Sequence, residues 1–573
     1  MKSRRKAARA DPFPVCRALI GPKAWPRLLK ACGCLARPES LPARLAAIKA
    51  RPGAPDFLPE LARLEWTRHE VSKGMKPPAN GTGRFEVNPT LVLLPLSWRL
   101  CGVVNPAGAP SEVERAPRAG AEHAMIWRDP STGETRVQAA EDADLLALKV
   151  VVEEIPVAKA ARAAKAAVPV VENSLWRAAQ KGILLAPRSR IRRDPALFPI
   201  PAETPAAFVS SPTFLVQWHI TQACDLRCKH CYDRSRRSPL TLEQGMKVLD
   251  DLRRFCLDRR VRGHVCFTGG NPFLYPKFGE LYRAAAARGF PTSILGNPVP
   301  RGALEKLLSI QRPEYYQVSL EGLPGYNDRI RGAGHFARTI EFLGLLRDLE
   351  VESTVMLTLA RDNLEQVLPL AERLRGHTRH FTFNRLSQVG EGAALAMPSR
   401  AAYAAFLETY LKAAESNPML HLKDNLFNIV RRRRGEPPFD GCTGYGCGAA
   451  FNFVAVLPDG QAHACRKFPS PIGNLLRQTL AEIYDSNAAR RYRAGCRACA
   501  GCPLRPTCGG CMAIAFARGL NVFGERDPYC FMADQVSTGI SSLCRAGDGD
   551  SRLSRAKLTA SLHFPDGRVM YSR

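Results

Sequence analysis

The feature that most constrains this fold is a sixfold alternation of strand-like and helix-like segments between residues 213 and 416. Short apolar segments predict strands at 214–221, 264–268, 292–295, 315–320, 352–358 and 380–384. Amphipathic segments after each of them predict helices, the first of which begins with a capping box of Thr241 and Gln244. Because parallel strands are joined by right-handed helical crossovers, the pattern predicts an α/β fold with six strand–helix repeats in a parallel sheet.

A loop with three closely spaced cysteines follows the first predicted strand. Cys224, Cys228 and Cys231 form a CxxxCxxC pattern, which chance would give about 0.02 times in a chain with this cysteine content. Three thiolates in a short loop suit an iron–sulfur cluster, whereas structural zinc normally takes four protein ligands. Three ligands also leave one iron open to a substrate or cofactor. The alternative is a zinc site with a distant fourth ligand such as His230.

The segment from Trp218 to Tyr232, WHITQACDLRCKHCY, resembles the signature of the radical S-adenosylmethionine (SAM) enzymes. The resemblance implies a TIM-like partial (β/α)6 barrel, which agrees with the six strand–helix repeats, and a [4Fe–4S] cluster held by Cys224, Cys228 and Cys231. It further implies that SAM chelates the fourth iron and is cleaved reductively to a 5′-deoxyadenosyl radical, which abstracts hydrogen from a substrate.

Glycine and polar residues follow the other predicted strands, at the edge where parallel α/β folds bind ligands. The family usually has Gly-Gly-Glu-Pro after the second strand, so Asn271 removes a charge near the amino group of the cofactor. Ser319 matches a polar residue on the ribose side, and Arg331 matches an arginine often placed on the methionine carboxylate. The expected SAM-binding residues are Gly269, Gly270, Asn271, Asn297, Ser319, Glu321 and Arg331.

A second group of cysteines begins at Cys442 and resembles the SPASM extension of peptide-modifying radical SAM enzymes. The usual form has three residues between the last clustered pair, and here there are two. The alternative is a zinc ribbon built from the two CxxC pairs, and Cys496 is a competing ligand. The resemblance implies two auxiliary [4Fe–4S] clusters, one on Cys442, Cys447, Cys465 and Cys511 and one on Cys499, Cys502, Cys508 and Cys530.

Composition divides the chain into five parts. Residues 1–185 are rich in Ala and Arg and predict a mainly helical, winged-helix-like module, a candidate for binding a precursor peptide. Residues 186–212 are rich in proline and predict an extended linker. The barrel is expected at 213–416, the SPASM domain at 440–545 and a C-terminal tail at 546–573.

Charge and apolar patterning restrict the partners. Lys and Arg number 82 against 53 Asp and Glu, a formal charge of +29, which favours an acidic partner. We find no aromatic-interleaved basic patch of the kind that stacks bases, which favours an acidic peptide over nucleic acid. The basic start lacks the apolar segment of a signal peptide, and no apolar run is long enough to cross a bilayer. We therefore expect a cytoplasmic protein with reduced thiols and no membrane partner.

Together these features predict an enzyme that modifies a ribosomally synthesised peptide by radical chemistry. Residues 210–535 resemble the selenobiotic-family peptide maturases in the segments WHITQACDLRCKHCYDRS, FTGGNP and CRKFPSPIGNL. The expected partners are the precursor peptide and an electron donor such as flavodoxin or ferredoxin. The alternatives are a sulfatase-type formylglycine maturase, disfavoured because Arg466 rather than Asp follows Cys465, a haem-biosynthesis radical SAM enzyme, and an iron–sulfur regulator that binds nucleic acid.

Overall fold

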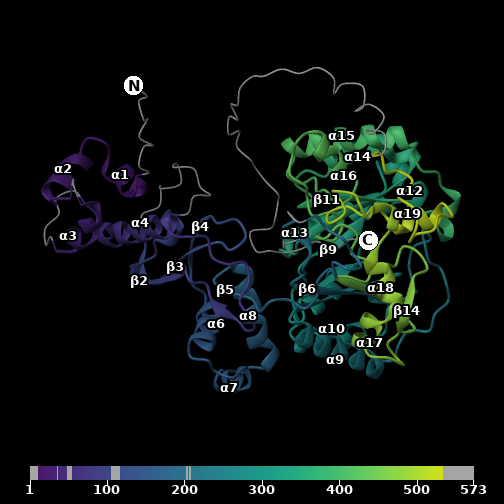
Figure 1. Ribbon diagram of the computed structural model, residues 1–573, viewed down its shortest axis with the longest axis horizontal. Helices are drawn as coiled ribbons and strands as arrows, with labels where there is room; N and C mark the ends of the chain where they lie inside the picture. The colour runs from purple at the N-terminus through teal and green to yellow at the C-terminus, as the bar shows by residue number, and fades with distance from the viewer. Residues whose placement is uncertain are drawn as a thin grey trace. The chain divides into compact units, whose positions relative to one another are not determined.

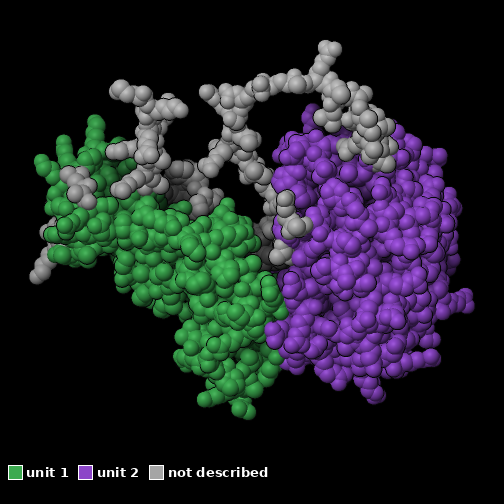
Figure 2. All heavy atoms as spheres, in the orientation of Figure 1, with its two compact units in different colours: residues 1–188 green, residues 189–573 purple. Residues whose placement is uncertain are grey.

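The computed structural model describes residues 11–34, 37–47, 54–104, 117–201, 204–205 and 208–532 (Figure 1). The chain forms two compact units, residues 1–188 and 189–573 (Figure 2). The tail expected at 546–573, the end of the expected SPASM domain and Cys544 lie outside the described residues. No helix in the described part of the chain is both long and apolar enough to cross a membrane.

The first unit combines short helices with a three-stranded antiparallel sheet in the order β2-β3-β4. One apolar cluster, which contains four buried cysteines, lies around α4, and a second lies around Trp127 and α8. The elements are α1 (Pro14–Ile20), α2 (Trp25–Ala31), α3 (Leu41–Ala47), α4 (Leu58–Lys73), β1 (Glu86–Val87), β2 (Val92–Trp98), α5 (Cys101–Val104), β3 (Ala119–Arg128), β4 (Thr135–Ala139), α6 (Asp142–Val152), α7 (Val157–Ala163), α8 (Val168–Lys181) and β5 (Leu184–Leu185).

The second unit contains the expected barrel. Strands β6 to β11 are parallel, and each pairs with its neighbour in the chain, which confirms the predicted (β/α)6 arrangement. The predicted capping box of Thr241 and Gln244 is present at the start of α9. The elements are β6 (Thr213–Thr221), α9 (Leu242–Arg259), β7 (Arg262–Gly269), α10 (Phe278–Ala287), β8 (Thr292–Leu295), α11 (Arg301–Leu308), β9 (Tyr316–Ser319), α12 (Pro324–Arg331), α13 (His335–Asp348), β10 (Ser353–Leu359), α14 (Val367–Arg373), β11 (His380–Arg385) and α15 (Arg400–Ser416).

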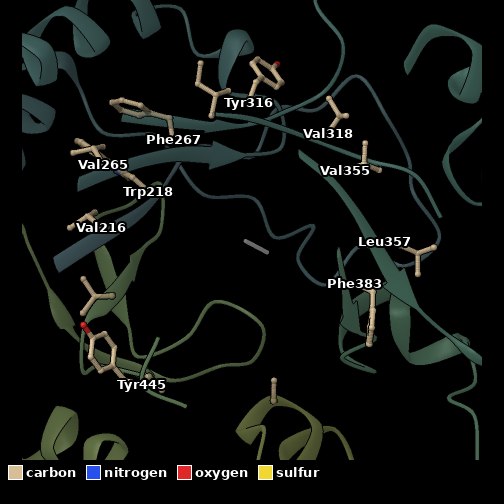
Figure 3. Packing of buried hydrophobic residues seen from close by; sticks show 14 of the residues in the cluster. Val216, Trp218, Val265, Phe267, Tyr316, Val318, Val355, Leu357, Phe383 and Tyr445 are labelled. Carbon is tan, nitrogen blue, oxygen red and sulfur yellow. The ribbon is translucent and has the colours of Figure 1, made fainter. Parts of the chain in front are cut away.

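The barrel strands have one apolar and one more polar face. Alternate residues such as Trp218 on β6 and Phe267 on β7 form the apolar core, and the rings of these two stack 6.2 Å apart (Figure 3). Because successive strand residues point to opposite faces, the strand residues that alternate with these core residues face the barrel interior. These include the buried polar side chains of Gln217, His219, Thr268, Gln317, Ser319 and Thr382.

The cysteine-rich region continues the barrel sheet. Strand β12 (Phe453–Val456) pairs in parallel with β6, and β13 (Gln461–His463) and β14 (Pro471–Asn474) follow antiparallel, which gives a nine-stranded sheet. The expected boundary at 440 is therefore not a break in the sheet. The remaining helices are α16 (Phe427–Arg433), α17 (Leu480–Asp485), α18 (Asn487–Ala494) and α19 (Met512–Ala517).

The described residues between 189 and 212 belong to the second unit and include a turn at Asp194–Phe198, so they do not form the extended linker that the proline content predicted. Ile191 is fully buried in the barrel core. The buried Arg193 guanidinium donates hydrogen bonds to the carbonyls of Tyr445 at 3.1 Å, Cys447 at 2.7 Å and Arg493 at 3.0 Å. The same guanidinium lies 4.0 Å from the ring centroid of Phe451. This segment therefore fixes the backbone beside Cys447.

Arg193→Ala is expected to lower the free energy of unfolding by about 3 kcal/mol, because buried carbonyls lose their donor. The matched control is the exposed neighbour, Arg192→Ala, which should cost less than about 0.5 kcal/mol. Urea denaturation followed by tryptophan fluorescence measures both values. Equal midpoints for the two variants would show that the Arg193 contacts do not hold this segment.

Candidate functional site

The cysteine loop lies at the carboxyl end of β6 and is anchored at several points. Gly270 N donates to Thr221 O at 2.9 Å, and Asn271 N donates to Ala223 O at 2.8 Å. Farther along, Lys229 N donates to Ile330 O at 3.0 Å. The thiol of Cys224 is exposed, while Cys228 and Cys231 are half-buried. Backbone bonds to neighbouring barrel loops therefore hold the three thiols at one end of the sheet.

Gly269 and Gly270 make this anchoring possible. Gly269 has φ +139°, and a Cβ there would lie 2.2 Å from Thr221 O. A Cβ on Gly270 would lie 2.2 Å from Ala223 O and 2.8 Å from Cys224 Cβ. We expected these glycines to let the backbone approach a ligand. In the structure they let the β7 loop approach the cysteine loop itself.

Asp225 is a site residue that the sequence analysis missed. Its Oδ1 accepts hydrogen bonds from Asn271 Nδ2 at 3.1 Å and from Asn297 Nδ2 at 2.6 Å. Asn297 Nδ2 also lies 3.7 Å from Cys224 Sγ. The two predicted asparagines therefore converge on one carboxylate within the cysteine loop, which places an acid beside the position where Asn271 lacks one. The sequence did contain a signal for this role, because Asp225 is the acidic residue between Cys224 and Cys228.

Glu321 and Arg331 form a buried ion pair beside the second cysteine. Arg331 Nε and Nη2 donate to Glu321 Oε1 at 2.8 and 2.5 Å, and Arg331 Nη1 lies 3.8 Å from Cys228 Sγ. Burial acts to raise the pKa of Glu321, but the charges of His230 and Arg331 and the hydrogen bond from Thr358 N outweigh it, so the pKa is lowered. Glu321 is therefore ionised and orients the guanidinium toward Cys228.

Several polar atoms in the barrel interior have no hydrogen-bond partner within the described ranges. They are Thr268 Oγ1, both side-chain amide atoms of Gln317, and Thr382 Oγ1. All three residues are almost completely buried. Buried polar atoms are normally paired with protein, water or ligand. Together with Ser319, buried at the end of β9, they give the inward face of the barrel strands a polar character.

The later cysteines separate into two groups in space. Burial, together with the charges of Cys511, Cys465 and Cys442, raises the pKa of Cys447 to about 12. Cys465 and Cys511 also influence each other, so these four lie near one another. We call Cys442, Cys447, Cys465 and Cys511 the first thiol set.

The other group surrounds Cys499. Burial and the charges of Cys496, Cys502 and Cys530 raise the pKa of Cys499 to about 12. Burial also raises the pKa of Cys508, and Cys530 and Cys502 act in the same direction. We call Cys499, Cys502, Cys508 and Cys530 the second thiol set. Cys496 lies beside it, and its thiol donates to Glu525 O at 2.8 Å.

The donor chemistry of the three groups fits iron–sulfur clusters. In the described part of the chain, no three His, Cys, Asp or Glu side chains are placed to hold a single metal ion. A [4Fe–4S] cluster instead takes thiolates on different irons, so its ligands do not need to meet at one atom. The two ligand sets that the SPASM resemblance implies stay a prediction, since Cys496 also lies beside Cys499.

Comparisons with known proteins identify two domains. Residues 218–374 match the radical SAM superfamily model, and residues 447–512 match the SPASM iron–sulfur cluster-binding domain model. The antilisterial bacteriocin subtilosin biosynthesis protein AlbA of Bacillus subtilis is 25% identical over 323 residues, covering 53% of this chain and 67% of that protein. An AdoMet-dependent heme synthase of Nitratidesulfovibrio vulgaris is 27% identical over 352 residues, with coverage of 56% and 93%.

Two further matches are a mycofactocin maturase and a solved structure. MftC of Mycobacterium ulcerans is 28% identical over 334 residues, covering 55% of this chain and 86% of that protein. The crystal structure of Streptococcus suis SuiB bound to S-adenosylmethionine is 17% identical, with a TM-score of 0.47, and covers 72% of this chain and 96% of that chain.

Gly270→Ala is expected to displace the cysteine loop, because its Cβ would overlap Ala223 O. Anaerobically reconstituted protein should lose one cluster, with iron falling from about 12 to about 8 atoms per chain, and should lose SAM binding measured by calorimetry. Gly279→Ala on α10 is the control, since a Cβ there meets nothing within 4 Å. Parental iron content and SAM affinity in Gly270→Ala would contradict the role given to this contact.

Proposed function

We propose that this chain, which carries a radical SAM domain followed by a SPASM domain, cleaves SAM reductively and uses the radical to modify a ribosomally made precursor peptide. The observation that carries the proposal is the set of three thiols at the carboxyl end of a parallel barrel. Three thiols leave one iron of a [4Fe–4S] cluster without a protein ligand. Bound there, SAM supplies the 5′-deoxyadenosyl radical.

The residues around the loop have separate roles in this proposal. Cys224, Cys228 and Cys231 hold the cluster. Glu321 orients Arg331 beside Cys228, and Asp225 joins the cysteine loop to two neighbouring strand ends through its amide partners. The loop and strand-end residues proposed to contact SAM are Gly269, Gly270, Asn271, Asn297, Ser319, Glu321 and Arg331.

The two thiol sets are proposed to hold auxiliary [4Fe–4S] clusters that carry electrons. Each set offers four cysteines, so every iron has a protein ligand and none is open to substrate. Because burial raises the pKa of several of these thiols, loading requires loss of protons when iron binds. A flavodoxin or ferredoxin is the proposed electron donor. The proposal places the protein in the cytoplasm, where thiols stay reduced.

A peptide is the favoured substrate for two reasons. AlbA is named for bacteriocin biosynthesis, and MftC is named as a maturase. The formal charge of +29 favours an acidic partner such as a leader peptide. We propose that the first unit, which precedes both family matches, binds that leader.

Haem-type chemistry is the second candidate, because the heme synthase match spans 93% of that enzyme. The long first unit is the feature that favours a macromolecular substrate over a porphyrin. Formylglycine formation is disfavoured, because the position after Cys465 holds Arg466, whose Nη1 donates to Tyr232 OH at 2.8 Å. That position supplies a cation in place of a carboxylate that accepts protons.

Cys228→Ala is expected to abolish 5′-deoxyadenosine formation from SAM under dithionite, at least 100-fold below the parent. The reason is that the cluster loses one of three ligands while Arg331 loses its thiolate neighbour. Chromatography of the quenched reaction measures the product. The control is Cys256→Ala, a buried thiol in helix α9 outside the three groups, which should retain activity. Parental product formation in Cys228→Ala would refute the radical SAM assignment.

A second test addresses the substrate. Co-expression with a short open reading frame next to the gene should give a peptide whose mass changes only with the parent enzyme and not with Cys228→Ala. Mass spectrometry with fragmentation locates the change. An unchanged peptide, together with conversion of a porphyrin by the same preparation, would favour the haem-type candidate.

A further inference from the structure

Buried cations gather around the first thiol set. Lys423 Nζ donates to Cys442 O at 3.4 Å, and Arg193 Nη2 donates to Cys447 O at 2.7 Å. Arg466 and Lys467 directly follow Cys465 in the chain. Arg193, Lys423 and Arg466 are buried, and Lys467 is half-buried. Among the described residues, none of these four cations forms an ion pair with a carboxylate.

The sulfurs of the first thiol set lie near these cations, and they become negatively charged when the thiols lose their protons on loading with iron. Lys423 Nζ contacts the backbone of Cys442, and Cys442 and Cys465 are its cysteine neighbours. Lys467 lies two residues after Cys465 and has Cys511, Cys442 and Cys465 as electrostatic neighbours. Two lysines and two arginines therefore surround a site that becomes anionic when it is loaded.

A fifth cation near this set is already neutralised. Arg385 Nε lies 2.7 Å from Asp424 Oδ2, and Arg385 Nη2 lies 2.6 Å from Asp527 Oδ2. Cys511 N donates to the same Asp527 Oδ2 at 2.9 Å. This arginine and its two carboxylates together carry a net charge of −1, which offsets one of the four cations around the first thiol set.

The second thiol set has a weaker positive surrounding. Arg505 is buried near Cys499 and Cys502, and its Nη2 donates to Ala494 O at 2.6 Å. Arg526 faces Cys530 but is exposed, so water screens its charge. The carboxylate of Asp527 acts on Cys508 and Cys530 in the opposite sense. One buried cation therefore faces the second thiol set, whereas three buried cations and one half-buried cation face the first thiol set.

Reduction adds one negative charge to a cluster, and nearby buried cations stabilise that charge most strongly where the effective dielectric constant is low. We propose that Lys423, Lys467 and Arg466 give the cluster on the first thiol set a higher reduction potential than the cluster on the second. This inference rests on the proposed auxiliary clusters. The positive charges of these three residues would stabilise the reduced cluster. None of the three is a catalytic residue.

The first set is also linked to the radical-generating loop. Cys231 is followed by Tyr232, whose hydroxyl accepts from Arg466 Nη1 at 2.8 Å, and Arg466 follows Cys465. One hydrogen bond therefore connects the chain next to a ligand of the barrel cluster with the chain next to a ligand of the first auxiliary cluster. An electron that leaves the barrel cluster is expected to reduce the cluster on the first thiol set, which lies beside this hydrogen bond.

The test measures potentials and not turnover. Full-length Cys224→Ala/Cys228→Ala/Cys231→Ala protein, reconstituted anaerobically, should keep about 8 iron atoms per chain in two clusters. A dithionite titration followed by electron paramagnetic resonance should show two one-electron steps. Lys423→Met and Lys467→Met should each move the step of higher potential to a lower potential and leave the other step in place. Cys442→Ala in the same background identifies the first cluster, because its signal should change.

Matched variants separate charge from folding. Lys423→Arg keeps the charge and should retain the parental potential, and Lys412→Met, an exposed lysine on α15, should move neither step. If Lys423→Met fails to hold iron, the half-buried Lys467→Met decides the outcome. Movement of the lower step, of both steps or of neither overturns the inference. An iron content near zero in the triple-alanine parent would instead refute the auxiliary clusters of the proposed function.

Discussion

The close backbone contact between the β7 loop and the cysteine loop is the constraint on which the site depends. Gly270 N and Asn271 N donate hydrogen bonds to the carbonyls of the residues on either side of Gln222. A side chain at Gly269 or at Gly270 would overlap the cysteine loop. Without this contact, holding three thiols together in a loop of about twenty residues after β6 would cost much conformational entropy. The contact transfers the rigidity of the sheet to the thiols.

Buried charge is the second element that organises the molecule. Glu321 and Arg331 lie side by side beneath Cys228, and Arg385 is held between Asp424 and Asp527 near Cys511. Buried ion pairs repay their desolvation cost only when geometry and hydrogen bonding are good. Here both arginines make several charge-assisted bonds. Each pair therefore fixes a guanidinium next to a thiol, where a loaded cluster would be negative.

The continuous sheet connects the two regions that chemistry assigns to different clusters. Because β12 pairs with β6, the strand that leads to the barrel loop and the strand that leads toward Cys465 belong to one rigid layer. The segment at Arg193 closes the other side by binding the carbonyl of Cys447. These two connections hold the barrel and the first thiol set together.

The barrel strands and the cysteine loop could be predicted from the amino-acid pattern alone. Six apolar segments with helical segments between them have few packing solutions, so the strands from Thr213 to Arg385 appeared close to their predicted positions. The cysteine spacing identified the loop and the second group of cysteines, because ligands a few residues apart in the sequence stay close together in the fold. The partners of the side chains in the site could not be predicted, because they become neighbours only when the chain folds. Asp225 joining two asparagines, Glu321 turning Arg331 toward Cys228, and four cations meeting around one thiol set all depend on residues far apart in sequence. Periodicity reports which face of an element is buried, but it carries no information about which charged side chains meet there.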